Sequence, residues 1–203
     1  MNILKKLIIC CILSIGSNAL GDIADHTRKT QLICASCHGE AGDAKIPSYP
    51  KLAGQNEKYF IKQMLAFKKA QRDNVMMQNI ASNLTESDLL DLAAYYAKQP
   101  PNIGIASRAL VKRGQRLYRA GDKTQHLPAC MACHGPAGEG NTLAGIPLLA
   151  GQHSTYTQAQ LLAYREKSRK TDAMQIMQDI AKQLTDDDIV ALSSYIEGLH
   201  RIH

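Results

Sequence analysis

The stretch "CMACHG" at residues 130–135 decides the fold, and the stretch "CASCHG" at residues 34–39 is a near copy of it. Each copy places two thiols and an imidazole within five consecutive residues. The two copies use four of the six cysteines in the chain and lie 96 residues apart. Such a duplicated motif predicts that the same chemistry occurs twice, once in each half of the chain.

The repeat extends well beyond the cysteines. The segment "PKLAGQ" at 50–55 matches "PLLAGQ" at 147–152 with an offset of 97 residues. Further on, "MQNIA" at 77–81 matches "MQDIA" at 177–181 with an offset of 100 residues. Self-similarity of this kind is the signature of a duplicated structural unit, and the small drift in offset indicates short loop insertions.

The boundary between the two units is marked by residues that break helices. Pro100 and Pro101 end the preceding helical pattern, and Gly104 gives the backbone conformational freedom after it. We therefore expect a first domain over residues 22–99, a linker over residues 100–104 and a second domain over residues 105–203.

The N-terminus has the layout of a secretory signal peptide. Lys5 and Lys6 precede the apolar stretch "LIICCILSIG", and Ala19 and Gly21 are small residues placed before a cleavage site. The apolar stretch is short for a membrane-spanning helix, which needs about 20 residues. We expect residues 1–21 to be removed on export and the mature protein to work in the periplasm.

Both halves are predicted to be helical. Apolar residues recur at three-and-four spacing, and patterns that alternate as in strands are absent. A threonine followed three residues later by an aspartate is a helix-start signal, and it occurs at Thr85 and at Thr185. The fold class is therefore all-α, with about three helices in each half and a loop over residues 171–180. The expected helices cover residues 26–36, 57–69 and 105–119, and two more begin after Thr85 and Thr185.

The composition indicates a globular protein with an unusual core. Hydrophobic residues make up 45% of the chain, but it has no Trp and only two Phe. The core must therefore gain its bulk elsewhere, or enclose a large apolar group that is not protein. The formal net charge is +6, and the basic residues form no patch interleaved with aromatics, so we expect no nucleic-acid binding.

Two thiols at this spacing have several possible uses. A redox dithiol would need a βαβ setting, which the helical pattern lacks, and disulfides would leave both histidines unexplained. A zinc site would have to draw its thiols from motifs 96 residues apart, unlike the short spacings of zinc ribbons. Covalent haem explains the whole motif, because both thiols add across vinyl groups and the next histidine supplies an iron ligand. We predict two haem c groups per chain, one held by Cys34 and Cys37 with His38, the other by Cys130 and Cys133 with His134.

The sixth iron ligand is expected to be a methionine in each half. Met77 and Met177 occupy the same place in the repeat, and thioether sulfur is a ligand that raises the reduction potential. Met76 stands beside Met77 and leaves the choice of sulfur in the first half open. The carbonyls of Pro50 and Pro147 are candidates for accepting the second N–H of each ligating imidazole. The other five histidines have no counterpart in the opposite half: His26, His126, His153, His200 and His203.

The duplicated Cys-x-x-Cys-His, the paired Ala-Gly-Gln turns and the paired "MQxIAxxLT" segments together resemble the dihaem cytochrome c4 family. That resemblance covers nearly all of the mature chain. It implies two tandem class I cytochrome c folds related by a pseudo-twofold axis, each with one haem ligated by His and Met. It also implies a periplasmic protein, soluble or loosely attached to the membrane, that passes single electrons to a terminal oxidase.

Three functions compete at this point. An electron carrier would receive electrons from a quinol-cytochrome c reductase-type donor. It would have no small-molecule substrate if both irons have two protein ligands, because no open site would then remain. A dihaem peroxidase would need one iron with an open sixth position, which the paired methionines argue against. A haem-bearing subunit of a membrane complex would keep the signal peptide as an anchor, and the N-terminal sequence of the purified protein separates this possibility from a carrier. The run "REKSRK" at residues 165–170 could dock an acidic partner or be a solvated face.

Overall fold

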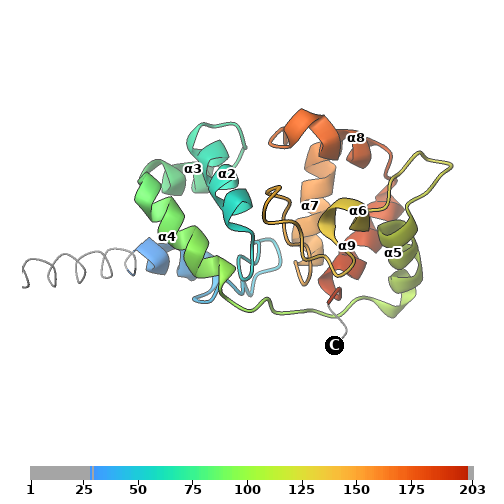
Figure 1. Cartoon of the computed structure of the whole chain (residues 1–203), viewed down its shortest axis with the longest axis horizontal. Coiled ribbons are helices and arrows are strands. Elements are labelled where there is room, and N and C mark those ends of the chain that lie inside the picture. Colours follow the sequence, from blue (N-terminus) through green and yellow to red (C-terminus); the bar gives the residue numbers. More distant parts are fainter. Residues whose placement is uncertain (1–27, 29, 201–203) are drawn as a thin grey trace, which may run out of the picture.

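The computed structural model describes residues 28 and 30–200, so the signal peptide expected at residues 1–21 lies outside the described part. The chain forms two helical lobes joined by an extended connection along one side (Figure 1). The described residues contain no strands beyond two isolated bridges, and the all-α prediction is confirmed. The first lobe holds a helix over residues 30–38, α2 (Glu57–Lys68), α3 (Val75–Ser82) and α4 (Glu86–Ala97). The second holds α5 (Arg108–Ala120), α6 (Met131–His134), α7 (Ser154–Arg165), η1 (Ala173–Gln175), α8 (Ile176–Lys182) and α9 (Asp186–Glu197).

The last helix of each lobe begins where the sequence predicts. Thr85 and Thr185 are the N-caps of α4 and α9, and both close a reciprocal capping box with the aspartate three residues on. In α4 the Thr85 side chain accepts from the Asp88 backbone N–H at 3.2 Å, and the Asp88 carboxylate accepts from the Thr85 N–H at 2.7 Å. Two otherwise unpaired backbone donors are satisfied in this way, which fixes the start of each helix.

Each lobe packs its helices around a small core of its own. In the first lobe α2 and α4 bury Phe60, Leu92 and Tyr96. In the second lobe α5 lies across α9, and Gly114 makes this close crossing possible, because a Cβ there would overlap the backbone carbonyl of Ala191. The cores leave a large space beside the cysteine motifs, which is the site described below.

The segments that carry the methionines are helical, so the expectation of a loop at residues 171–180 is wrong. Met77 lies in the first turn of α3, whose cap residue Asn74 accepts a hydrogen bond from the Met77 N–H at 2.9 Å. Met177 lies in the first turn of α8, and the Asp172 carboxylate accepts from the Gln178 N–H at 3.1 Å. With these short helices, each lobe has more than the three helices expected. The first opening helix ends at residue 38, two residues later than expected, and the opening helix of the second lobe, α5, begins three residues later than expected.

The Ala-Gly-Gln turns join the two lobes reciprocally. The Gln55 side chain donates to the carbonyl of Leu148 at 3.1 Å and accepts from the N–H of Leu148 at 3.0 Å. The Gln152 side chain donates to the carbonyl of Lys51 at 3.0 Å and accepts from its N–H at 2.9 Å. Each residue in one pair lies 97 positions from its counterpart in the other, so the contact follows the pseudo-twofold relation of the repeat.

Candidate functional site

A single cavity of about 550 Å³ runs between the two lobes and reaches both cysteine motifs. All eight residues expected to hold the haems line it, and they come from both lobes. The walls between them are mainly apolar side chains. The expected haem residues are Cys34, Cys37, His38 and Met77 in the first lobe and Cys130, Cys133, His134 and Met177 in the second.

Each cysteine motif forms one short helical turn that ends at a glycine. The motif of the second lobe is α6, with Cys130 at its N-cap, and the motif of the first lobe ends the helix over residues 30–38. Gly39 and Gly135 follow with φ of 79° and 82°, a conformation that residues with a Cβ rarely adopt. The turn brings both thiols and the imidazole to the same side, at the cavity.

Both imidazoles are buried and held through one nitrogen. Nδ1 of His38 lies 2.8 Å from the carbonyl oxygen of Pro50, and Nδ1 of His134 lies 3.1 Å from that of Pro147. This confirms the expected proline carbonyls as partners. Because a carbonyl can only accept, Nδ1 carries the proton and Nε2 keeps its lone pair for a metal. Burial lowers the pKa of both histidines, although the bond to the proline carbonyl opposes this, and so favours the neutral form that ligates.

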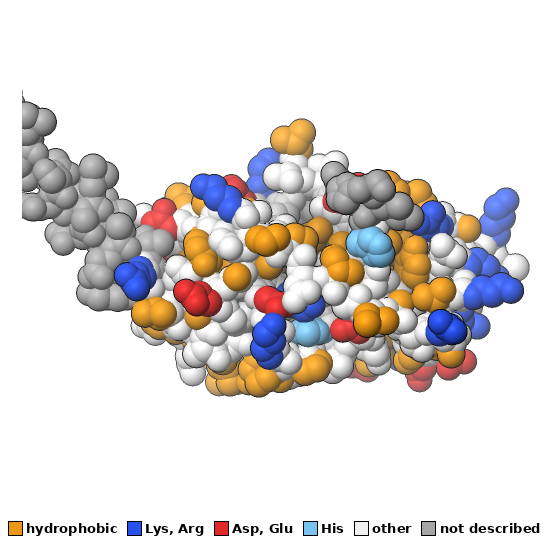
Figure 2. Space-filling model, turned by 90° about the horizontal axis from the view of Figure 1, so that it is seen from below, with side chains coloured by type: hydrophobic (Ala, Val, Ile, Leu, Met, Phe, Trp, Pro, Cys, Tyr) orange, Lys and Arg blue, Asp and Glu red, His pale blue; other side chains and the backbone are white. Residues whose placement is uncertain are grey.

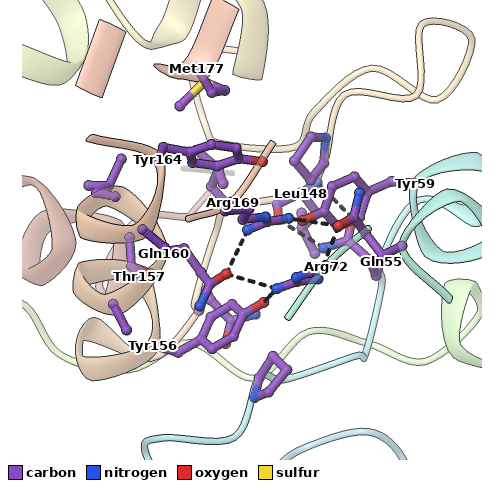
Figure 3. Close-up of a pocket in the computed structure, with 18 of the residues that line it drawn as sticks. Gln55, Tyr59, Arg72, Leu148, Tyr156, Thr157, Gln160, Tyr164, Arg169 and Met177 are labelled. Atoms are coloured by element: carbon purple, nitrogen blue, oxygen red, sulfur yellow. Dashed lines mark hydrogen bonds between the residues drawn. The ribbon is translucent and has the colours of Figure 1, made fainter. Parts of the chain in front are cut away.

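The methionines differ in how far they are exposed. Met77 and Met177 are partly buried at the cavity wall, and Figure 3 shows Met177 among the lining residues. Met76 also touches the cavity, but 53% of its surface is exposed. Met174 is 86% exposed and is not among the residues that line the cavity. The placement therefore favours Met177 over Met174, and Met77 over Met76, as the sixth iron ligand.

The thiols are poorly suited to zinc. Burial raises the pKa of the Cys130 thiol to about 11, and it also raises the pKa of Cys34. Metal ions bind the thiolate, which these environments disfavour. Within the described part of the chain, no three His, Cys, Asp or Glu side chains are grouped as a metal site would need. The four described cysteines form no disulfide, and two of them lie in each lobe.

A haem fits the donors and the walls of this cavity. Thiols at Cys-x-x-Cys spacing, an anchored neutral imidazole and a thioether sulfur are the donor set of a c-type haem. Large apolar side chains such as Phe60, Leu149 and Leu192 form the walls, as an apolar macrocycle requires. The sparse aromatic content of the chain is consistent with this, because the haem fills the space that aromatic side chains fill in other cores.

The remaining described histidines lie elsewhere. His153 is buried in the contact between the lobes, where its Nε2 lies 2.7 Å from the carbonyl oxygen of Ala44. His126 is exposed and has a positive φ of 52°. His200 contacts the carbonyl of Gly198. None of the three lines the cavity. His26 and His203 fall outside the described residues.

Two arginines at the cavity were not identified from the sequence as functional. Arg169 belongs to the run "REKSRK", which was interpreted as a docking surface or a solvated face, but it is only 4% exposed. Its repeat counterpart Arg72, 97 residues earlier, is also buried. The matching position of the two arginines in the repeat is the sequence signal that could have identified them. Exposed basic side chains lie at several places on the face in Figure 2, with one group at the outer end of the second lobe, where α5 carries Lys112 and Arg116.

Comparisons with known proteins point to one group. The sequence pattern of the family described as cytochrome c matches residues 111–200. The chain is 43% identical to a cytochrome c4 from Pseudomonas aeruginosa over 202 residues, which covers 97% of this chain and all of that relative. It also resembles the crystal structure of reduced recombinant cytochrome c4 from Pseudomonas stutzeri, with a TM-score of 0.84 and 42% identity over 87% of this chain and 98% of that one. A thiosulfate dehydrogenase electron acceptor from Stutzerimonas stutzeri is 37% identical, over 83% of this chain and 79% of the relative.

Proposed function

The chain belongs to the cytochrome c4 family, and on that premise we propose that it carries single electrons in the periplasm from a quinol-cytochrome c reductase-type donor to a terminal oxidase. As a member it is an electron-transfer protein with two tandem cytochrome c domains and two haem c groups, not an enzyme. Redox proteins are therefore its partners, and the two named here are the proposal. The domain boundaries at residues 22–99 and 105–203 stay a prediction.

The proposed haem sites are the two thiol pairs and the residues that face them. Cys34 and Cys37 hold one haem, with His38 and Met77 as its iron ligands. In the second lobe the thioether linkages fall on Cys130 and Cys133, and the iron ligands are His134 and Met177. Each bound haem supplies an iron that alternates between the ferrous and ferric states.

The protein's part in the reaction is to fix the ligands and exclude water. The Pro50 and Pro147 carbonyls hold each imidazole in one orientation and one tautomer, so that the ligand geometry need not change when the iron changes its charge. The methionine sulfur favours ferrous iron, and burial in apolar walls does the same, so both raise the potential into a range useful to an oxidase. His38 with Met77 and His134 with Met177 would each supply two protein ligands, which would leave neither iron a position for a substrate.

The observation that carries this proposal is the presence of a methionine at the cavity in each lobe, together with an anchored histidine. A peroxidase would need one of these positions open. Periplasmic location is supported by the sequence of residues 1–21, and a mature N-terminus at Asp22 would bear it out. Among the described residues, no helix has the length and apolar character to cross a bilayer. We propose peripheral attachment to the membrane surface at most.

The proposed function predicts fast reoxidation by an oxidase and negligible peroxide turnover. The reduced holoprotein is mixed with membranes that contain a terminal oxidase, and its visible spectrum is followed with and without an oxidase inhibitor. We expect a second-order rate constant of about 10⁶ M⁻¹ s⁻¹ or more, typical of specific protein association, and a rate that falls as salt is added. A thiosulfate dehydrogenase serves as an alternative donor in a parallel reduction assay.

Two results would contradict the proposal. One is peroxide turnover by the oxidised or half-reduced protein at a rate comparable to that of a true peroxidase. The other is failure of the membranes to reoxidise a protein that small inorganic oxidants reoxidise readily, since that would show a working redox centre with a different acceptor.

A further inference from the structure

Two buried arginines meet where the lobes face each other across the cavity. Arg72 is 8% exposed and Arg169 is 4% exposed, and both line the cavity that reaches the two cysteine motifs. Each guanidinium lies over an aromatic ring of its own lobe, with 4.6 Å from Cζ of Arg72 to the Phe67 ring and from Cζ of Arg169 to the Tyr164 ring. The two arrangements are related by the pseudo-twofold symmetry of the repeat.

Each arginine reaches across to the other lobe. Nη2 of Arg72 donates to the hydroxyl of Tyr156 at 2.7 Å, and Nη2 of Arg169 donates to the hydroxyl of Tyr59 at 2.8 Å (Figure 3). Tyr59 lies on α2 and Tyr156 on α7, so each bond runs from the segment that follows one of these helices to the other helix, in the opposite lobe. Each arginine therefore forms a hydrogen bond with the lobe opposite its own.

Two glutamine side chains lie between the guanidinium groups and serve both. Oε1 of Gln63 accepts from Arg72 at 3.0 Å and from Arg169 at 2.9 Å. Oε1 of Gln160 accepts from both arginines at 2.8 Å. Two positive charges are thus held close together by acceptors that are neutral.

No protein carboxylate balances these charges in the described part of the chain. Neither arginine forms an ion pair there, and the only Asp or Glu among the cavity-lining residues is Asp73, which is exposed. Burial would by itself raise the pKa of the Tyr59 hydroxyl, but the positive charges of Arg169 and Arg72 hold that pKa below its ordinary value. A buried charge is costly unless it is paired. Two of them side by side call for anions that the polypeptide does not provide.

We propose that Arg72 and Arg169 form one shared cationic site for the propionate carboxylates of both haems, and that this site ties the reduction potential of each haem to residues of both lobes. A haem carries propionate carboxylates along one edge, which gives the cavity the anions it lacks. The inference rests on the proposed function in placing one haem beside each cysteine motif of this cavity.

The site has hydrogen-bonding capacity left for these carboxylates. A guanidinium group has five N–H donors. The structure records three hydrogen bonds from Arg72 and four from Arg169. The hydroxyls of Tyr59 and Tyr156 accept from arginine, and the described residues include no acceptor for their own O–H. These free donors make the site suitable for anions.

The test is to neutralise one arginine and measure both potentials in the holoprotein. In Arg72→Gln we expect both midpoint potentials to shift downward, because loss of a nearby positive charge favours the ferric state of each haem. Arg72→Lys keeps the charge, so both midpoint potentials should lie close to those of the wild type. Arg116→Gln removes the same charge from the exposed face of α5 and should leave both potentials almost unchanged. The sulfur-to-iron charge-transfer bands confirm in each variant that both haems keep their methionine.

A second variant tests the site without removing an arginine. Gln63→Glu changes no volume and places a carboxylate between the two guanidinium groups, where it competes with the propionates. We expect it to fold and to lower both potentials, whereas Gln71→Glu, at an exposed position nearby, should not. This variant decides the matter if Arg72→Gln does not accumulate with two haems.

Three results would overturn the inference. One is that the potentials of Gln63→Glu match those of the wild type. Another is that only one haem responds to Arg72→Gln, since the site would then not be shared. The third is that the wild-type potentials depend on added inorganic phosphate while those of Arg72→Gln do not, since a free anion would then occupy the site. In each case the wild-type spectra would still show two ligated haems, so the proposed function would stand.

Discussion

Met177→Leu is expected to abolish the far-red sulfur-to-iron charge-transfer band of one haem and to lower the potential of that haem by on the order of 0.1–0.2 V, within the ~0.8 V over which axial ligands tune haem potentials. The physical reason is that leucine keeps the apolar wall of the cavity but removes the thioether that favours ferrous iron. Optical redox titration measures both effects. The second haem should keep its band.

The matched control for this variant is Met174→Leu, three residues earlier in the chain. Met174 is 86% exposed and lies away from the cavity, so its replacement should leave both bands in place and change the free energy of unfolding by no more than about 0.5 kcal/mol. Loss of the band in Met174→Leu and its survival in Met177→Leu would reverse the ligand assignment. The choice between Met76 and Met77 in the first lobe would then need the same test.

The double substitution Cys130→Ala with Cys133→Ala is expected to remove one of two covalent haems. Both vinyl groups of the second-lobe haem would lack their thiols, while Cys34 and Cys37 would still hold the first. The intact mass of the purified chain should therefore fall by one haem, and acid–acetone extraction should leave the other haem on the polypeptide.

Met131→Leu is the control for the double variant, because it changes a residue between the two cysteines and keeps both thiols. It should retain two haems. A double variant that still carries two covalent haems would contradict the assignment of these cysteines. A wild-type chain that binds zinc in place of haem, and loses it in the double variant, would revive the four-cysteine metal site.

The sequence allows prediction of the features that the repeat duplicates. The 97-residue offset pairs Pro50 with Pro147, and both carbonyls contact the imidazoles of His38 and His134 as expected. The helix starts at Thr85 and Thr185 were predictable because a capping box is a local signal, complete within four residues. These features were predictable because they depend only on residues close together in the sequence or on the repeated motif.

The missed features depend on contacts between distant parts of the chain. The short helices α3 and α8 have too few turns to show a period, and their N-caps, Asn74 and Gln175, lack the threonine pattern of the longer helices. The burial of Arg169 could not be inferred from "REKSRK", since its main acceptors, Gln63 and Tyr59, lie more than 100 residues away. A basic run is usually solvated, as Lys167 and Lys170 are here, and Arg169 is the exception because it contacts the opposite lobe.

The central claim is that the chain carries two one-electron centres, each with His and Met as its iron ligands. Reductive titration of the mature holoprotein, followed through the visible and far-red spectrum, tests it most directly. We predict that full reduction takes two electrons per chain, in two one-electron steps, with two thioether charge-transfer bands in the oxidised protein. A single one-electron step, or a high-spin haem without a methionine band, would contradict the account.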